Sequence, residues 1–346
     1  MTQRRKPVTI KDIAKRAGVA HSTVSMVMNE RKYVSQFTRE KVLKITREMG
    51  YQPNLIARSL ISHRSQAVAV VFPESPYFFS ITYFLQIING VQNACKKYNQ
   101  ALMFFSLDQT KGESYVQISR KWLVNLMVIM NVDYTRDISR DIKDLQKAGI
   151  HFSIITRYLG EEKINSVCLD NDKGVKLALE HLVKLGHRRI GYMSGNPNSA
   201  DGPERLKALR KYSNEFGLDR DEDLIVHGNF TFESGEEAVK KLLDLPKRPT
   251  AIFSASDYMA IGAMRTMKQR GLKVPQDMAM VGFDDTLEAA YVEPPLTTIR
   301  QPLQEMGEEA VDLAYKAMND PNFIPRTVIK EPELVIRKSC GEQKHV

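Results

Sequence analysis

The chain has 346 residues, of which 42% are hydrophobic and 26% are charged. It is longer than one ordinary core, and its composition is globular rather than disordered, so we expect two or three domains. The longest unbroken apolar run, residues 67–72, is far too short to cross a membrane. Cys95, Cys168 and Cys340 form no C-x-x-C pair, which argues against a structural zinc site or a disulfide framework. The N-terminus shows no secretory signal, so we expect a cytoplasmic protein.

Positive charge is concentrated at the N-terminus. Residues 1–66 contain 14 Lys and Arg against 4 Asp and Glu, a net charge of +10, whereas the whole chain carries +9. Residues 67–346 therefore sum to −1. A cationic head on a near-neutral body is typical of a protein that binds nucleic-acid phosphates. A merely solvated basic arm, the alternative, does not explain why patterned apolar residues run through the same segment.

Two short helices joined by a tight turn are predicted over residues 8–29. Thr9 can cap the first helix, and Asp12 completes a capping-box pattern. Gly18 breaks that helix. The residues expected to face inward are Ile10, Ile13, Ala14, Ala17, Val19, Val24, Val27 and Met28. The residues expected to face outward at the start of the second helix are His21, Ser22, Ser25 and Met26, where a recognition helix meets base edges. A surface helical hairpin is the alternative, and the charge favours DNA.

A third helix is predicted over residues 38–49, with Val42, Ile45 and Met49 inward and Gly50 as its stop. Pro53 can then start a short helix that extends to about residue 60. A helix this short has too few internal hydrogen bonds to persist alone. We expect it to fold only against a partner or DNA, as a switchable hinge.

Beyond residue 66, buried-strand runs alternate with helical stretches. The predicted strands are 68–72, 102–105, 124–130, 152–155, 190–193, 251–254 and 278–283, and the predicted helices are 87–98, 141–148, 174–185, 235–243 and 260–270. This alternation predicts parallel sheets covered on both faces, and about seven strands suit two doubly wound lobes. Ligands of such folds bind at the carboxyl ends of the strands. The polar residues that follow the strands are Asp170, Ser194, Ser256, Asp257, Asp284 and Asp285.

From residue 8 to about residue 339, the chain resembles the LacI/GalR family of bacterial transcription regulators. The resemblance depends on many collinear matches rather than on one motif. They are residues 8–29, Thr38-Arg39, Gly50-Tyr51, Pro53-Asn54, residues 57–60, Asp170-Asn171, Gly174, His181-Leu182, residues 185–190, Gly195, Arg205, residues 260–262, 274–277 and 281–284, Leu296-Thr-Thr-Ile-Arg-Gln-Pro302, residues 334–337 and Ser339.

The resemblance implies an all-α helix-turn-helix head plus an α/β core. The core would be periplasmic-binding-protein-like, with two doubly wound parallel-sheet lobes crossed by three strands. The implied domains are a head over 1–51, a hinge helix and linker over 52–66, and an effector-binding and dimerisation core over 67–346. Within the core, the N-lobe would comprise about 67–169 and 301–330, and the C-lobe about 170–300 and 331–346. It further implies a homodimer that binds a near-palindromic double-stranded DNA operator. We expect a repressor controlled by a small effector, such as a sugar or a nucleoside-like compound, in the cleft between the lobes.

The resemblance also implies a set of DNA-binding residues. They are Thr9, Ala20, His21, Ser22, Thr23, Ser25, Met26, Asn29, Tyr33, Asn54, Ala57, Arg58 and Leu60. Leu60 would act as an apolar wedge in the minor groove, with a buried hinge contact as the alternative. Met26 replaces a polar or basic residue, so it offers apolar contact, for example to a thymine methyl group, instead of hydrogen bonds to guanine. Ala20 replaces the usual serine cap of the second helix.

A second implied set binds the effector. It comprises Tyr83, Phe84, Thr156, Asp201, Arg205, Phe230, Ser256, Asp257 and Asp284. Arg205 suits hydroxyls or carboxylates, with a surface salt bridge as the alternative. Asp257 and Asp284 suit vicinal hydroxyls, or instead cap helices. Phe230 would stack on a ring or pack in the core.

Two departures from the family pattern affect this set. Thr156 replaces a usual Asp, and Ser256 replaces a usual Asn, so the effector cannot be copied from a relative. Aromatic residues 77–79 precede Tyr83 and Phe84, which leaves open which of these aromatics enters the cleft.

Enzyme chemistry has little support in the sequence. No G-x-x-x-x-G-K-[ST], G-x-G-x-x-G, H-E-x-x-H or G-x-S-x-G motif is present. We therefore expect no catalytic activity, no cofactor and no metal, and a sugar or nucleotide enzyme on a doubly wound fold is disfavoured. The other alternative is a periplasmic-type small-molecule-binding protein without a DNA role. The basic head and the missing signal segment argue against it.

Overall fold

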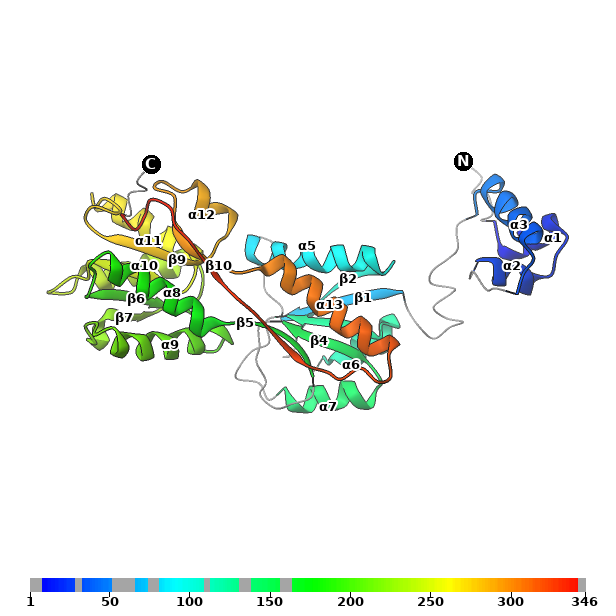
Figure 1. Cartoon of the computed structure of the whole chain (residues 1–346), viewed down its shortest axis with the longest axis horizontal. Coiled ribbons are helices and arrows are strands. Elements are labelled where there is room, and N and C mark those ends of the chain that lie inside the picture. The colour runs from blue at the N-terminus through cyan, green and yellow to red at the C-terminus, as the bar shows by residue number, and fades with distance from the viewer. Residues whose placement is uncertain are drawn as a thin grey trace. The chain divides into compact units, whose positions relative to one another are not determined.

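The computed structural model describes residues 8–28, 33–51, 66–73, 81–108, 113–130, 138–155 and 164–341. The chain divides into two compact units, residues 1–65 and 66–346, which Figure 1 shows as a small helical unit and a larger α/β unit. Within the described ranges, no helix combines the length and apolar character needed to cross a bilayer.

Over residues 8–28 and 33–51, the first unit forms a head with three helices, α1 (Ile10–Ala17), α2 (His21–Met28) and α3 (Gln36–Glu48). The Asp12 carboxylate accepts hydrogen bonds from the Thr9 backbone N–H at 2.8 Å and from the Thr9 hydroxyl at 2.7 Å, which confirms the predicted capping pattern. Gly18 ends α1 with a positive φ of 64°. The core of the head consists of Ile13, Ala14, Ala17, Val24, Val27 and Val42. All six belong to the predicted inward set.

The second unit contains two six-stranded sheets. One sheet has the order β11-β5-β4-β3-β1-β2 and is parallel throughout; we call it the N-lobe sheet. Its strands are β1 (Ala67–Pro73), β2 (Ala101–Leu107), β3 (Leu126–Met130), β4 (His151–Ile155), β5 (Asn165–Leu169) and β11 (Thr327–Lys330). The C-lobe sheet has the order β12-β10-β9-β8-β6-β7, and only β12 is antiparallel. Its strands are β6 (Ile190–Ser194), β7 (Ile225–His227), β8 (Ala251–Ser254), β9 (Ala279–Asp284), β10 (Thr297–Arg300) and β12 (Glu333–Val335).

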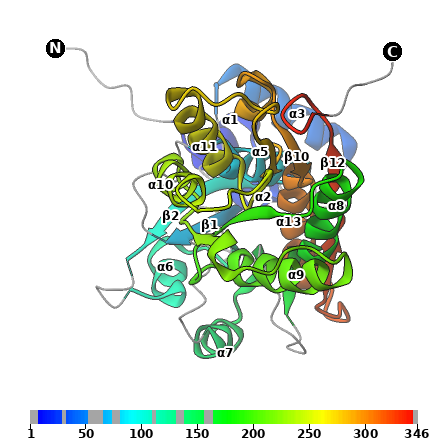
Figure 2. The ribbon, with the colours of Figure 1, turned by 90° about the vertical axis from the view of Figure 1, so that its left-hand side faces the viewer.

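Helices cover both faces of each sheet. In the N-lobe, alternate residues of β1 and β3 pack against α5 (Thr82–Lys97) and α13 (Leu303–Asn319) on one face. The intervening residues pack against α6 (Tyr115–Trp122) and α7 (Ser139–Lys147) on the other face. In the C-lobe, α8 (Asn171–Lys184) and α9 (Asp201–Glu215) lie on one side of the sheet, and α10 (Phe232–Leu243) and α11 (Asp257–Gln269) lie on the other (Figure 2). Burial on both faces explains why most of these strands are continuous apolar runs.

The chain passes between the two lobes three times, from β5 to α8, from β10 to α13 and from β11 to β12. The first and third of these crossings contact each other. The Asp170 amide donates to the Lys330 carbonyl oxygen at 2.9 Å, and Lys173 forms an ion pair with Glu331 at 2.7 Å. The expected fold class, a helix-turn-helix head with two doubly wound lobes, is confirmed.

Several elements were not predicted. They are β5, β7, β10, β11 and β12, together with α6, α9, α13, the short α12 (Leu287–Tyr291) and the 3-10 turn η3 (Glu222–Leu224). Most of the missed strands are short or rich in polar residues; β10, for example, is Thr-Thr-Ile-Arg. In addition, β3 begins at Leu126 rather than at residue 124, because Leu123 caps α6 in the left-handed conformation with a φ of 55°.

Candidate functional site

The first candidate surface lies on α2 of the head. His21 and Ser22 are exposed, as are Thr9, Ala20 and Tyr33, and Tyr33 is 92% exposed. Thr23, Ser25 and Met26 are only half-buried, because the helix has just eight residues and Val24 and Val27 turn its other side into the core. Of the four side chains that were predicted to face outward, His21 and Ser22 are exposed, and Ser25 and Met26 are only partly exposed.

The start of α2 has no side-chain acceptor at Ala20. Its carbonyl oxygen accepts from the Thr23 and Val24 amides at 3.0 and 3.2 Å, so Ala20 occupies the capping position, and a methyl group cannot accept a hydrogen bond. Basic side chains remain exposed around α2, among them Lys11, Lys15, Lys41 and Lys44. The predicted DNA-binding residues Asn29, Asn54, Ala57, Arg58 and Leu60 lie outside the described residues.

The second candidate site surrounds Arg205 on α9. This side chain is only 2% exposed. Its Nε donates to Asn171 Oδ1 at 2.8 Å, and a terminal nitrogen donates to the Ala255 carbonyl oxygen at 2.6 Å. The guanidinium carbon lies 3.7 Å from the centroid of the Phe283 ring. Because the side chain is buried, a surface salt bridge is the wrong interpretation of Arg205. The guanidinium is held in one orientation by these contacts and presents a fixed set of hydrogen-bond donors.

Acidic groups outnumber the single cation in this cluster. Arg205 lies 3.7 Å from Asp284 and 3.9 Å from Asp201. The Asn171 amide donates to Asp201 at 3.0 Å and to Glu204 at 2.8 Å. We call Asn171, Asp201, Glu204, Arg205 and Asp284 the Arg205 cluster. Three carboxyl groups around one guanidinium favour a ligand that donates hydrogen bonds over a ligand that is itself an anion.

The protonation of the cluster reflects its burial. Burial raises the pKa of Asp284 to about 7, against the opposing effect of Arg205. Burial also raises the pKa of Glu204, while the hydrogen bond from Asn171 lowers it. Perturbed carboxyl groups of this kind are typical of binding sites.

Asp284 sits at a strained point of the backbone, where β9 ends. Its φ is 125°, and the φ of Asp285 is 58°, both in the region that favours glycine. The Gln301 amide, on the crossing between β10 and α13, donates to Asp284 Oδ1 at 2.6 Å. Asp285 is held by Arg300 at 2.7 Å and by Arg337 at 2.6 Å. These contacts fix the orientation of the Asp284 carboxyl group toward Arg205.

Asp257 and Ser256 do not offer free groups to a ligand. Asp257 is fully buried, and its two oxygens accept from the Thr286 amide at 2.8 Å and the Thr298 hydroxyl at 2.5 Å. Burial raises its pKa well above the ordinary value, with a further contribution from the charge of Asp284. The Ser256 hydroxyl accepts from the Met259 amide at 3.3 Å and caps α11. In this structure the two residues have supporting roles, because their polar atoms hold α11, β10 and the loop after β9 together. Their contacts with an effector stay a prediction.

Tyr83 brings the N-lobe to the Arg205 cluster. Burial and the charges of Asp201 and Asp284 raise the pKa of the Tyr83 phenol, and Arg205 lowers it, so the phenol lies within range of all three groups. The Phe84 ring packs edge-on against Tyr83, with the ring centroids 5.2 Å apart. The other aromatic candidates, residues 77–79, and the predicted effector residue Thr156 lie outside the described residues.

A second group of contacts joins the lobes beside this site. The Tyr258 hydroxyl lies 2.9 Å from the Thr82 amide, which donates to it, and the Thr82 hydroxyl donates to Glu288 at 2.7 Å. Phe230, by contrast, packs within the C-lobe. Its ring lies so close to Gly195 that a Cβ there would be 2.0 Å from a ring carbon. Phe230 is partly buried and packs against the C-lobe core, and its stacking on an effector ring stays a prediction.

The sequence analysis did not single out Asn171 and Gln301 as site residues. Asn171 connects Arg205 to Asp201 and Glu204, and Gln301 orients Asp284. Both belong to segments that match the family, and Asn171 is the second residue after β5, at the carboxyl end of a strand. Among the described residues, no group of three His, Cys, Asp or Glu side chains is arranged to hold a metal ion.

Comparison with protein families gives two matches. Residues 9–54 match the model described as bacterial regulatory proteins, lacI family, and residues 179–340 match a periplasmic binding protein-like domain. The chain is 34% identical to the HTH-type transcriptional regulator CelR of Thermobifida fusca over 98% of this chain and 100% of that protein. It is 32% identical to the HTH-type transcriptional repressor PurR of Photobacterium profundum over 96% of this chain and 99% of that protein.

Solved structures agree with these matches. The lac repressor dimer bound to operator and the anti-inducer ONPF has a TM-score of 0.82 at 28% identity, over 96% of this chain and 99% of that one. The complex of transcriptional regulator CelR with cellobiose has a TM-score of 0.71 at 32% identity, with the same coverage. The relatives are transcriptional regulators, which agrees with the expectation that this chain is not an enzyme.

Proposed function

The chain belongs to the LacI family of bacterial regulatory proteins and is a DNA-binding transcriptional regulator, and from this premise we propose that it is a sugar-controlled repressor. It binds a near-palindromic operator as a homodimer, in the cytoplasm where the operator is found. The observation that carries the proposal is the Arg205 cluster, in which one buried guanidinium and three carboxyl groups meet at the carboxyl ends of the C-lobe strands.

The proposed domains keep the boundaries predicted from the sequence. The head comprises residues 1–51, the hinge and linker 52–66 and the core 67–346. Membership of the two sheets supports the lobe boundaries, since β5 and β11 lie in the N-lobe sheet and β6 to β10 and β12 lie in the C-lobe sheet.

The cluster supports a neutral, hydroxyl-rich effector. Sugar hydroxyls both donate and accept, so they can satisfy the carboxyl groups and the Arg205 donors at once. A sugar phosphate would place a further negative charge among three acids. The Tyr83 ring supplies an aromatic surface next to these polar groups. The CelR relative was solved with cellobiose, which agrees with this class of ligand.

Exposed apolar side chains support the homodimer. Phe104 on β2, an edge strand of the N-lobe sheet, is 39% exposed, and Leu85 on the neighbouring α5 is 37% exposed. In the C-lobe, Leu287 and Tyr291 are 61% and 80% exposed. Apolar side chains at a parallel edge are typical of a surface that pairs with another chain. The lac repressor relative was solved as a dimer on its operator.

Control of DNA binding follows from the contacts between the lobes. An effector that binds Arg205 and Tyr83 contacts both lobes and so favours one of their arrangements. In a dimer, a change in lobe arrangement alters the separation of the two hinges, and hinge helices that lose their mutual packing release the operator. The contacts of Thr82 with Tyr258 and Glu288 stabilise the arrangement observed here.

The test combines an effector screen with a DNA-binding assay. A thermal-shift screen compares neutral mono- and disaccharides with sugar phosphates and nucleosides, because a true ligand raises the unfolding temperature by mass action. Each hit is then added to fluorescence-anisotropy titrations on palindromic and random duplexes. We expect a neutral sugar to stabilise the protein and to change its affinity for a palindromic duplex.

Two results would contradict the proposal. If only sugar phosphates or nucleosides stabilised the protein, the inferred effector class would be wrong. If no palindromic duplex bound more tightly than random DNA at moderate ionic strength, with or without effector, the operator-binding function itself would be wrong.

A further inference from the structure

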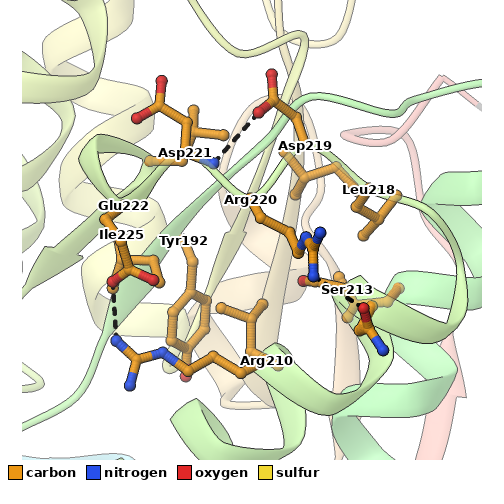
Figure 3. Close-up of a pocket in the computed structure, with 14 residues that line it drawn as sticks. Tyr192, Arg210, Ser213, Leu218, Asp219, Arg220, Asp221, Glu222 and Ile225 are labelled. Carbon is orange, nitrogen blue, oxygen red and sulfur yellow. Dashed lines mark hydrogen bonds and ion pairs between the residues drawn. The ribbon is translucent and has the colours of Figure 1, made fainter.

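A cavity of about 250 Å³ lies in the C-lobe, near the amino ends of β6 and β7 (Figure 3). The cluster follows the carboxyl ends of the strands, whereas this cavity includes Ile190 and Ile225, the first residues of β6 and β7. The end of α9 and the segment 218–222 complete its wall. No residue of the Arg205 cluster lines the cavity, and nothing in the proposed function uses it.

The floor of this cavity is apolar and holds one unsatisfied polar group. Leu179, Leu209 and Leu224 line it and are buried. Tyr192 also lines it and is 1% exposed, and its buried hydroxyl has no hydrogen-bond partner in the described part of the chain. Buried hydroxyl groups nearly always have a hydrogen-bond partner. We therefore expect the Tyr192 hydroxyl to donate to an acceptor from outside the protein. Burial also raises the pKa of the phenol, against the opposing effect of the Arg205 charge, and keeps it a neutral donor.

Among the described residues, Arg220 at the rim of the cavity forms no ion pair. Arg210 pairs with Glu222 at 2.8 Å, and Arg189 pairs with Asp219 and Asp221. Arg220 instead donates to the neutral Asn214 side chain at 2.9 Å, and within the described residues it makes no ion pair. Figure 3 shows the Arg220 side chain and the Tyr192 ring among the lining residues, with Arg210 and Ser213 on α9 beside them. The positive charge of Arg220 is thus available to an anion at the mouth.

We propose that this cavity binds a small aromatic carboxylate that carries a hydroxyl group on its ring. The carboxylate pairs with Arg220, the ring lies among the leucines, and the ring hydroxyl accepts a hydrogen bond from Tyr192. The cavity is slightly smaller than the usual range for ligand sites, which suits a single ring and is too small for a disaccharide. The cavity lining also contains Asp219, Asp221 and Glu222, but these acids pair with Arg189 and Arg210. Arg220 is therefore the charged group that remains for an anion, whereas carboxyl groups outnumber the guanidinium in the Arg205 cluster.

The experiment uses the full-length protein and three probes: 4-hydroxybenzoate, benzoate and 4-hydroxybenzyl alcohol. Isothermal titration calorimetry is expected to rank 4-hydroxybenzoate first. Benzoate should bind about tenfold more weakly than 4-hydroxybenzoate, because it has no ring hydroxyl to accept a hydrogen bond from Tyr192. The alcohol should bind more weakly by about tenfold or by a larger factor, because it has no negative charge to pair with Arg220. Equal affinities for all three probes, or no binding of any, would overturn the proposal.

Variants locate the site and identify the two contacts. Tyr192→Phe should remove the preference for 4-hydroxybenzoate over benzoate, and Arg220→Gln should weaken both carboxylates but not the alcohol. Arg265→Gln, an exposed arginine of the same lobe whose partner is Glu236, is the matched control and should change nothing. Loss of probe binding in Arg205→Ala with retention in Arg220→Gln would place the ligand in the Arg205 cluster and overturn the proposal.

Stability without a ligand is a further measurement. Because the Tyr192 hydroxyl has no partner, Tyr192→Phe should unfold at the same temperature as the original protein or at a higher one. A clear decrease would show that the hydroxyl is already bonded within the protein, and the inferred contact with a ligand would be wrong.

Discussion

The head and the core present their functional groups in opposite ways. On α2 of the head, His21 and Ser22 are exposed neighbours in one short stretch of sequence, and the surrounding lysines are solvated. In the core, Asn171, Arg205 and Asp284 come from three distant segments and are almost completely buried. The exposed surface of α2 suits a large charged partner, such as DNA, that contacts the protein from outside. The buried core residues suit a small ligand enclosed by groups whose orientation is already set.

This difference predicts which substitutions affect only one property of the protein and which affect several. Exposed head residues have few protein contacts, so their variants should change DNA binding with little effect on the core. Residues of the Arg205 cluster share hydrogen bonds, so their variants should change stability and ligand binding together. Four substitutions test this contrast.

Arg205→Ala should have the largest effect. It removes the cation beside Asp201 and Asp284 and takes the Arg205 donor from the Ala255 carbonyl oxygen. The loss of one partner from a buried ion pair costs about 3–5 kcal/mol of the free energy of unfolding. Effector binding should disappear, and operator binding should persist while the protein remains folded. Chemical denaturation and the thermal-shift screen measure both. Lys207→Ala, an exposed position on the same helix, is the control and should stay within about 0.5 kcal/mol. An unchanged effector response in Arg205→Ala would contradict the assigned site.

Phe104→Lys should weaken the dimer. A lysine at the exposed edge of the N-lobe sheet would be desolvated by the partner chain, so dimerisation should weaken by about a hundredfold, or roughly 2.7 kcal/mol. Sedimentation velocity measures the change, and operator affinity should fall with it. Ile329→Lys on β11, at the other edge of the same sheet and 57% exposed, is the matched control. If both variants remained dimers, the interface would lie elsewhere.

Asp284→Asn should alter the pH dependence of stability. The folded carboxyl group keeps its proton up to about pH 7, whereas its ordinary pKa is 3.8, so the folded state binds more protons than the unfolded state between these values. The stability of the original protein should therefore fall, relative to the Asn variant, as the pH rises from about 4 to about 7. The change is at most about 1.4 kcal/mol per pH unit, and the difference is constant above this range. Denaturation curves at several pH values measure it. A parallel pH dependence of the two proteins would show that Asp284 titrates normally.

Ala20→Ser should have the smallest effect, confined to the head. The serine hydroxyl can accept from an amide at the start of α2, which stabilises a helix by about 0.5–2 kcal/mol. Hydrogen exchange of the α2 amides in the full chain should slow, and exchange in the core should not change. Ala20→Gly should fall only a few tenths of a kcal/mol short of the serine variant. Protection of the α2 amides in Ala20→Ser that equals the protection in the original protein would mean that no capping hydrogen bond forms.

The two regions also differ in how well their residues were predicted. The capping residues Thr9 and Asp12, the turn at Gly18 and the inward face of the head all follow from spacing within a few residues, and the structure confirms them. In the core, Arg205 and Asp284 were singled out by matching segments of the family. Asn171 and Gln301 were missed, because their contacts join residues 34 and 17 positions apart. Asp257 was assigned to the effector because its sequence position does not reveal that both of its oxygens are already bonded inside the lobe.

By itself, the sequence determined the helical head, its charge, the alternation of strands and helices, and the family. These properties depend on local periodicity, composition and collinear motifs. Only the tertiary structure decided which acids surround Arg205, which polar side chains are committed to internal hydrogen bonds, and that a cavity with an unsatisfied Tyr192 hydroxyl exists in the C-lobe near the amino ends of β6 and β7. The physical reason is that burial and pairing are properties of side chains brought together from distant segments, and no local pattern specifies which of them will meet.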